Sequence, residues 1–368
     1  MRQGGDFDVH PATLFDLASV TKVVSPTTMA AILYERGLLE LDAPIGGTLP
    51  EFLSLRDPRR RDVTFRMLLA HSSGLPAYEK LFLKARTREE LLHAALTMPL
   101  SADPGSRAEY SDIGFIILGI ALERIAEESL DRFSQREIFG PLALTSTTFN
   151  PSKKLRPQIP PTADERESES HAAGTRERSA FRNRIIQGEV HDENAWVLGG
   201  VAGHAGLFST AEDIARFAHA MLQCATRGPC GAGAPAREPS NSSHDEDCQF
   251  ERAGAEATDS PETSRFPEDI PLLRPDTISL FTRRESTPAG TSRGLGWDTP
   301  SQPSQSGKYF GSRSFGHLGY TGTSLWIDPD RQLSITLLTN RTWPDCANQA
   351  IKQVRPKFHD AVVQAVFG

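Results

Sequence analysis

Apolar residues recur at helical spacing in several parts of the first two thirds of the chain. From Ser19 to Arg36 they lie three and four positions apart, and Gly37 follows as a natural helix end. Pro26 falls inside this segment, so we expect it to kink the helix or to shorten its first turns. Three further helices are predicted from the same period or from a clear N-terminal cap, at residues 87–97, 112–127 and 210–222.

The last third of the chain has a different pattern. Two β-branched and apolar runs, Ser324–Asp328 and Leu333–Asn340, are separated by turn residues and predict a hairpin. From about Pro344 the pattern predicts a helix that is interrupted at Pro356. The order of elements predicts an α/β (α+β) fold, with an antiparallel sheet flanked by helices and an inserted helical lobe. We expect residues 1–48 and 288–368 to form the sheet lobe and residues 49–287 to form the helical lobe.

Two polar segments lack such a period. Residues 164–179 predict a surface loop. Residues 225–268 are rich in Gly, Ala, Pro, Ser and acidic side chains, and Phe250 and Phe266 are their only large apolar residues. Such a segment buries too little apolar surface to offset its ordering entropy, so we expect a disordered acidic insertion.

Composition and charge exclude two classes of protein. The 368 residues include 40 basic and 47 acidic ones, a net charge of −7, which argues against a basic face for nucleic acid. The longest uncharged apolar run, Ile113–Leu122, is about half the length of a membrane-spanning helix. We therefore expect no nucleic-acid partner and no membrane span. The four cysteines form no CxxC pair and are expected to be reduced thiols.

The clearest chemical motif is Ser19-Val20-Thr21-Lys22. Residues three apart share a helix face, so the Lys22 amine can reach the Ser19 hydroxyl. A serine needs an adjacent base to become a nucleophile, and a desolvated lysine can supply one. The same spacing also arises by chance, since serine is common in this chain.

Two further motifs accompany it. Tyr110-Ser111-Asp112 stands at a loop-to-helix junction, where a tyrosine is also a common packing residue. The run from Phe315 to Tyr320, with Gly316 and Gly319, enters the first C-terminal strand, where a glycine lets a substrate approach the backbone.

In this order the three motifs resemble those of the serine β-lactamase and penicillin-binding protein superfamily, namely SxxK, a Tyr- or Ser-centred triplet and a KTG-like strand. Residues 63–76 also resemble the segment after the nucleophile helix in class C β-lactamase-like enzymes. Residues 203–213 resemble the Gly-Leu-x-Ser-Thr helix start of the same family. The resemblance covers nearly the whole chain.

The resemblance implies a role for each motif. Ser19 would be the nucleophile, Lys22 its base or proton relay, and Tyr110 a second relay to the leaving group. Which of Lys22 and Tyr110 takes the serine proton stays open. Substrate would be bound by Asp112, by His317 and Gly319 of the KTG-like triplet, and by Tyr320, whose backbone N–H joins that of Ser19 in an oxyanion hole. No metal or cofactor is implied.

Two positions depart from the family pattern. Asp112 stands where many relatives have Asn, and beside Lys22 a carboxylate would favour the charged ammonium. His317-Leu318-Gly319 lacks both the lysine and the hydroxyl residue, and a neutral imidazole binds a carboxylate less firmly than an ammonium does. Both changes weaken the case for an efficient β-lactamase.

We therefore expect a serine hydrolase that acts through an acyl-enzyme on a small-molecule or peptide substrate, most closely a D-alanyl-D-alanine carboxypeptidase. A carboxylesterase of the same fold is one alternative. The other is a catalytically silent protein that binds peptidoglycan-like peptides or acyl ligands.

Residues 188–194, with His204 beyond them, contain ligand types that suit zinc. The spacing lacks an HExxH or another clustered pattern, so we expect a polar loop at the cleft rim whose side chains bond one another.

The start of the chain gives a last expectation. In the resembling family a helix and a strand hairpin precede the nucleophile segment, but only eighteen residues precede Ser19 here. We expect a chain shortened at its N-terminus, with a sheet that lacks those strands. The resemblance implies the bacterial cell envelope, although no secretion signal is present.

Overall fold

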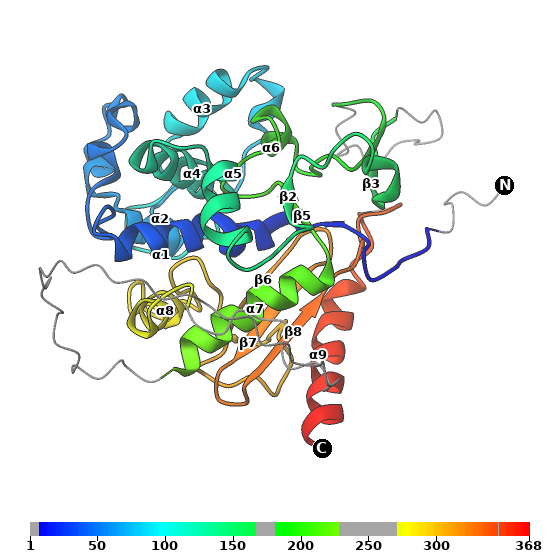
Figure 1. Cartoon of the computed structure of the whole chain (residues 1–368). Coiled ribbons are helices and arrows are strands. Elements are labelled where there is room, and N and C mark those ends of the chain that lie inside the picture. The colour runs from blue at the N-terminus through cyan, green and yellow to red at the C-terminus, as the bar shows by residue number, and fades with distance from the viewer. Residues whose placement is uncertain (1–6, 167–180, 228–270, 345) are drawn as a thin grey trace, which may run out of the picture.

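The computed structural model describes residues 7–166, 181–227, 271–344 and 346–368 (Figure 1). The predicted insertion 225–268 and loop 164–179 lie mostly outside these residues. The described helices are α1 (Thr28–Glu35), α2 (Phe65–Leu69), α3 (Arg88–Leu96), α4 (Asp112–Ala126), α5 (Leu130–Ser134), α6 (Glu193–Val197), α7 (Ala211–Thr226), α8 (Pro275–Thr282) and α9 (Ile351–Phe367). The strands are β1 (Phe15–Asp16), β2 (Thr148–Phe149), β3 (Pro161–Asp164), β4 (Ile185–Gln187), β5 (Leu207–Ser209), β6 (Phe315–Leu318), β7 (Ser324–Asp328) and β8 (Leu333–Leu337).

Strands β6, β7 and β8 form an antiparallel sheet in that order, and helices cover both of its faces. Side chains alternate along β7, as they must in a strand. Leu325 and Ile327 point into the main core, which includes Phe217 of α7. Trp326 points to the other face and packs with Val363 of α9. The predicted hairpin is confirmed, although β8 ends at Leu337, three residues before the predicted end.

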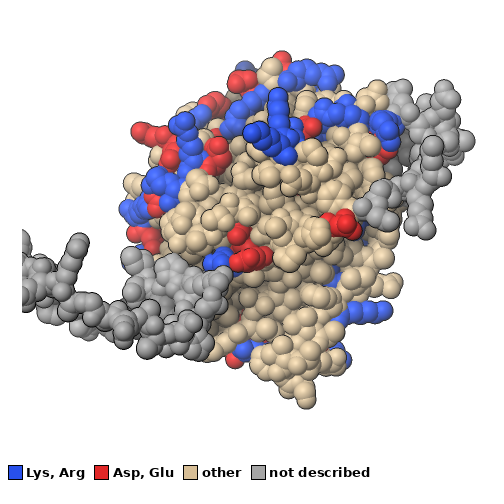
Figure 2. Space-filling view, turned by 45° about the vertical axis from the view of Figure 1, so that its right-hand side comes forward, with Lys and Arg blue, Asp and Glu red and all other residues tan. Residues whose placement is uncertain are grey.

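The helices divide between two lobes (Figure 1). Helices α2 to α6 lie above, the sheet with α7 and α9 lies below, and α1 runs along the boundary. Helix α7 falls within the range expected for the helical lobe, but it packs against β7 and β8. The lobe boundaries themselves stay a prediction. Figure 2 shows Lys and Arg side chains intermixed with acidic ones over the upper lobe, while the surface below is mostly uncharged.

Local sequence signals explain where the helices start. The side chains of Thr87, Ser111 and Thr210 each accept a hydrogen bond from the backbone N–H three residues on, at the starts of α3, α4 and α7. All three helices were predicted from the sequence and are confirmed.

The segment that carries Ser19 is more broken than the predicted single helix. A 3-10 turn (Ala18–Val20) is followed by a π-helical stretch (Val23–Thr27) that contains Pro26, and only then by α1. Proline has no N–H and its ring clashes with the carbonyl four residues earlier, so the regular helix cannot form around it. The predicted effect of Pro26 is confirmed. The predicted helix end at Gly37 is confirmed as well, because Gly37 follows α1 with a φ of +69°.

The predicted break at Pro356 is wrong, because α9 runs through it. Pro356 cannot donate a hydrogen bond to the carbonyl of Lys352, four residues earlier. That carbonyl instead accepts one from Gln305 Nε2, at 3.1 Å. A partner from a distant loop therefore satisfies the group that the proline leaves open.

Candidate active site

A cavity of about 620 Å³ opens between the two lobes, and six of the seven predicted site residues line it. Ser19 comes from the 3-10 turn before α1, whereas Tyr110 and Asp112 come from the start of α4. His317, Gly319 and Tyr320 come from the end of β6. The seventh residue, Lys22, is fully buried directly behind Ser19.

The Lys22 ammonium has an acceptor for each of its three N–H groups. Lys22 Nζ lies 3.1 Å from Ser19 Oγ, 2.7 Å from Asp112 Oδ1 and 3.0 Å from the backbone oxygen of His204. It also lies 4.9 Å from the centre of the Tyr110 ring. The predicted contact between Asp112 and Lys22 is therefore present, and the two form an ion pair.

These contacts fix the protonation of the resting site. Burial disfavours the charged form of Lys22, but the charges and hydrogen bonds of Asp112 and Tyr110 outweigh it and raise the pKa of Lys22 above its ordinary value. Burial also raises the pKa of Tyr110, against the lowering effect of Lys22. At neutral pH Lys22 is thus an ammonium and Tyr110 a neutral phenol.

The backbone before Ser19 is held both by a neighbouring side chain and by the residues that follow β6. Ala18 has a φ of +46°, a left-handed conformation that is strained for a residue with a side chain. Asp16 Oδ1 accepts a hydrogen bond from the Ala18 N–H at 2.8 Å. On the sheet side, the hydroxyls of Thr321 and Thr323 donate to the carbonyls of Asp16 and Leu17. The turn that carries Ser19 is therefore held against the end of β6.

Glycine is required at position 319 by this close packing. A Cβ on Gly319 would collide with Thr323 Oγ1 and with the carbonyl oxygen of Leu17. Because glycine has no side chain, the end of β6 can lie directly against the turn that carries Ser19.

His317 is neutral, as expected at the first position of the triplet. It is buried, and burial together with the charges of Lys22 and Arg293 holds its pKa well below the ordinary value. Its Nδ1 lies 2.8 Å from the Leu318 carbonyl oxygen, so Nδ1 carries the proton and Nε2 does not. Among the described residues, His317 Nε2 has no hydrogen-bond partner.

Two neighbours of Tyr110 were missed from the sequence. The His71 ring lies 4.5 Å from the Tyr110 ring, and its Nδ1 accepts a hydrogen bond from the Ser111 N–H. The Arg293 guanidinium lies 5.2 Å from the Tyr110 ring and 3.7 Å from Asp298. His71 falls within the family-like run 63–76, which was a usable signal, whereas nothing near Arg293 in the sequence connects it to Tyr110.

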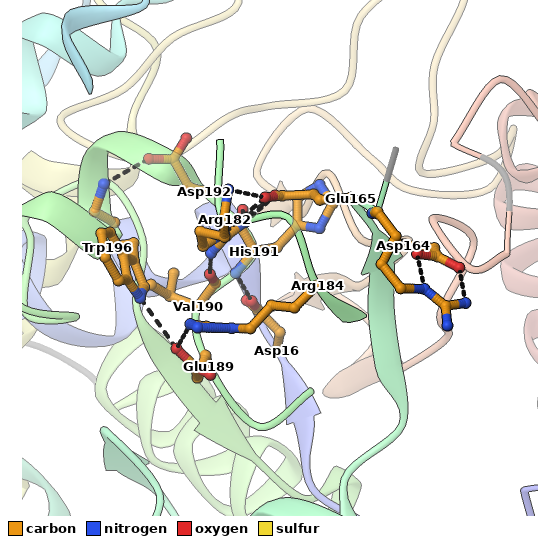
Figure 3. A network of polar contacts seen from close by, with 12 residues as sticks. Asp16, Asp164, Glu165, Arg182, Arg184, Glu189, Val190, His191, Asp192 and Trp196 are labelled. Carbon is orange, nitrogen blue, oxygen red and sulfur yellow. Dashed lines mark hydrogen bonds and ion pairs between the residues drawn. The ribbon is translucent and has the colours of Figure 1, made fainter. Parts of the chain in front are cut away.

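The loop that follows β4 forms a polar rim on the cavity (Figure 3). Asp192 Oδ1 and His204 Nε2 are 2.7 Å apart. Asp16 accepts a hydrogen bond from the His191 N–H. Arg182 pairs with Glu165 at 2.6 Å and donates to the His191 carbonyl. These mutually bonded side chains match the polar loop predicted for this stretch. Within the described parts of the chain, no group of three or more His, Cys, Asp or Glu side chains is arranged to hold a metal ion.

The chain was compared with known families and proteins. A family model described as Beta-lactamase matches residues 2–355. A putative D-alanyl-D-alanine carboxypeptidase of Escherichia coli K12 is 30% identical over 344 residues, which cover 89% of this chain and 69% of that protein. A second protein of that name, from Salmonella agona, is 29% identical over 360 residues, which cover 92% of this chain and 72% of that one.

Solved structures were compared as well. A β-lactamase/D-alanine carboxypeptidase from Pseudomonas syringae has a TM-score of 0.62 at 16% identity, covering 96% of this chain and 85% of that one. The hydrolase EstCE1, described as having promiscuous acyltransferase activity, has a TM-score of 0.60 at 19% identity, covering 94% of this chain and 85% of that one. These likenesses confirm the predicted mixed α/β fold.

Proposed function

The chain belongs to the Beta-lactamase family, and from this premise we propose that it is a serine hydrolase with D-alanyl-D-alanine carboxypeptidase-like activity. The observation that carries the proposal is the contact of Ser19 Oγ with Lys22 Nζ at 3.1 Å, beside Tyr110 and at the end of β6. Such a cluster suits attack of a hydroxyl on a carbonyl, with formation of an acyl-enzyme. The names of the curated relatives support a peptide that ends in D-alanyl-D-alanine as substrate.

The proton of Ser19 needs an acceptor, and a charged ammonium cannot be one. Asp112 lies 2.7 Å from Lys22 Nζ. If the Lys22 ammonium gives a proton to this carboxylate, the two side chains become a neutral amine and a neutral acid, and their total charge stays zero. We propose that Lys22 passes a proton to Asp112 as the substrate excludes water, and that the resulting amine takes the Ser19 proton. Tyr110 then protonates the leaving group and takes a proton from the Lys22 ammonium in return, and the Lys22 amine takes back the proton held by Asp112, so every group regains its starting protonation.

The carbonyl oxygen becomes an oxyanion during attack, and the proposed donors are the backbone N–H groups of Ser19 and Tyr320. Both residues line the cavity, and the packing of Gly319 against Leu17 holds the two backbones together. Donors fixed in this way stabilise a developing charge without reorganisation.

A carboxylesterase is the second candidate, and one observation favours it. The triplet position that is a lysine in the family pattern is a neutral, buried histidine here, and Leu318 replaces the hydroxyl residue. Both changes remove polar contacts that a peptide carboxylate would otherwise use, whereas a neutral ester loses nothing.

Parallel assays test the proposal. Release of D-alanine from an acetylated tripeptide ending in D-alanyl-D-alanine, and hydrolysis of p-nitrophenyl acetate, are measured for the wild type and for Ser19→Ala. We expect turnover of both substrates by the wild type and of neither by the variant. Ester turnover alone would favour the esterase, and reversible binding of a fluorescent penicillin without any turnover would identify a silent binding protein.

A further inference from the structure

A buried histidine ends helix α2 in a left-handed backbone conformation. His71 has a φ of +57°, and its N–H bonds back to the carbonyl of Leu68 in the last turn of α2. Glycine is the usual residue at this position of a helix end, because a side chain is strained there. The strain is a reason to ask what the imidazole does at this place.

His71 holds the backbone on both sides of Tyr110. Its carbonyl oxygen accepts a hydrogen bond from the Glu109 N–H at 2.8 Å, and its Nδ1 accepts one from the Ser111 N–H at 2.9 Å. The centre of its ring also lies 4.5 Å from the centre of the Tyr110 ring. One residue therefore holds Tyr110 through the residues before and after it and through its ring.

The hydrogen bond from Ser111 shows which nitrogen of the imidazole carries the proton. Because Nδ1 accepts a hydrogen bond, the proton of the neutral ring is on Nε2. Burial, together with the charges of Arg293 and Lys22, holds the pKa of His71 well below its ordinary value. The imidazole thus stays neutral, and Nδ1 stays an acceptor, across the neutral pH range.

The second nitrogen shows that packing alone does not explain this histidine. His71 is only 2% exposed, and among the described residues its Nε2 has no hydrogen-bond partner. A buried N–H without a partner costs stability, and an apolar side chain of similar size would avoid that cost. The acceptor that Nδ1 supplies to Ser111 is what an apolar side chain could not provide.

We propose that His71 is a positioning residue for Tyr110, and that it acts through the hydrogen bond from the Ser111 N–H to Nδ1. The proposal rests on the proposed hydrolase function, in which Tyr110 protonates the leaving group. His71 is not among the residues that line the cavity, so it acts on the reaction through Tyr110. A phenol that is not held in place loses the geometry that proton transfer needs.

Two esters with the same acyl group make the orientation of Tyr110 measurable. The leaving group of p-nitrophenyl acetate is weakly basic and departs with little help from an acid, whereas that of phenyl acetate is more basic and needs a proton. Since both esters give the same acetyl-enzyme, the ratio of their kcat/KM values reports the departure of the leaving group. We expect Tyr110→Phe to lower kcat/KM about 10²-fold for phenyl acetate and less than about tenfold for p-nitrophenyl acetate.

Two substitutions separate the acceptor from the rest of the His71 side chain. His71→Phe keeps a ring and removes the acceptor, so we expect a loss of about tenfold for phenyl acetate and little loss for p-nitrophenyl acetate. His71→Asn places its Oδ1 as far along the side chain as Nδ1 and tolerates the left-handed backbone, so it should keep the wild-type ratio. In the Tyr110→Phe background, His71→Phe should not change the ratio further, because the two residues act as one unit.

Glu127→Phe is the matched control for strain. Glu127 follows the far end of α4, outside the cavity wall, with a φ of +51°, so the same side chain enters the same backbone conformation. The ratio should stay at the wild-type value in this variant. If His71→Phe does not fold, His71→Gly, which relaxes the backbone and also lacks the acceptor, should show the selective loss instead.

The possible results separate the positioning role from the hydrolase function. Equal losses for both esters in His71→Phe, or a selective loss in His71→Asn as large as that in His71→Phe, would overturn the positioning role. A further selective loss when His71→Phe is added to Tyr110→Phe would overturn it too, since His71 would then act without Tyr110. Absence of ester turnover by the wild type would instead refute the proposed hydrolase function.

Discussion

Replacing Asp112 by asparagine should change how the activity depends on pH. In the wild type the pKa of Lys22 is raised above its ordinary value, so Lys22 stays an ammonium across the neutral range, and the fraction of enzyme that can begin the proposed proton transfer stays constant. We therefore expect kcat/KM for a neutral ester to be flat between about pH 6 and pH 9. Asparagine removes the carboxylate but keeps an oxygen that can accept a hydrogen bond from Lys22.

The size of the perturbation follows from the geometry. Two unit charges 2.7 Å apart attract by about 6 kcal/mol at an effective dielectric constant near 20. Lys22 is fully buried, so without this attraction burial acts on it with far less opposition and favours the neutral amine. The pKa of Lys22 should fall in the variant, and its free amine should then appear within the measurable pH range.

The assay is kcat/KM for p-nitrophenyl acetate from pH 5 to pH 9.5 at constant ionic strength. For Asp112→Asn we expect a rate that rises about tenfold per pH unit at low pH and then levels off. Asp276→Asn, which removes an exposed carboxylate on α8, should keep the flat wild-type profile. A flat profile in Asp112→Asn would refute the role given to Asp112 in the movement of protons.

Three further predictions concern packing and pH. Gly203→Ala would place a methyl group against the backbone oxygen of Phe115 in α4 and displace the adjacent His204 carbonyl, which accepts a hydrogen bond from Lys22. The kcat should therefore fall about tenfold or more without loss of folding, and a wild-type kcat would contradict this. Arg60→Met leaves three backbone carbonyls without the buried guanidinium that donates to them. The free energy of unfolding, measured by urea denaturation, should fall by about 3 kcal/mol, and an unchanged urea midpoint would contradict this. Burial lowers the pKa of His191 and of His359 to about 4, from 6.5, so both stay neutral in the fold while the unfolded chain takes up protons. Stability should therefore fall as the pH drops from about 6.5 to 4. Asp16 acts in the opposite direction, because burial raises its pKa to about 6 and the folded chain takes up one proton there. Equal urea midpoints at pH 7 and pH 5 would contradict the predicted loss of stability.

Local signals predicted several elements of the fold, because those signals act within a few residues. The cap of Thr87, the turn between the last two strands and the effect of Pro26 depend only on neighbours in sequence. The continuity of α9 could not be predicted in this way. It depends on Gln305, 47 residues before the carbonyl that its side chain bonds.

In the candidate site too, some contacts could be predicted from the sequence and others depend on residues far apart in the chain. The spacing of Ser19 and Lys22, and the resemblance that brought in Asp112, predicted contacts that the structure contains. The third acceptor of Lys22, the carbonyl of His204, lies 182 residues away, and a backbone oxygen leaves no trace in the sequence. Arg293 could not be found either, because it lies 183 residues after Tyr110 and only the fold brings the two side chains together.

The central claim is that Ser19 forms the acyl-enzyme, and mass spectrometry of the labelled protein tests it most directly. The wild type and Ser19→Ala are each treated with a fluorophosphonate and with a fluorescent penicillin, and the intact mass and the labelled peptide are determined. The account predicts a single adduct per chain, on the peptide that contains Ser19, and no adduct in Ser19→Ala. An adduct on another residue, or one that persists in Ser19→Ala, would contradict it.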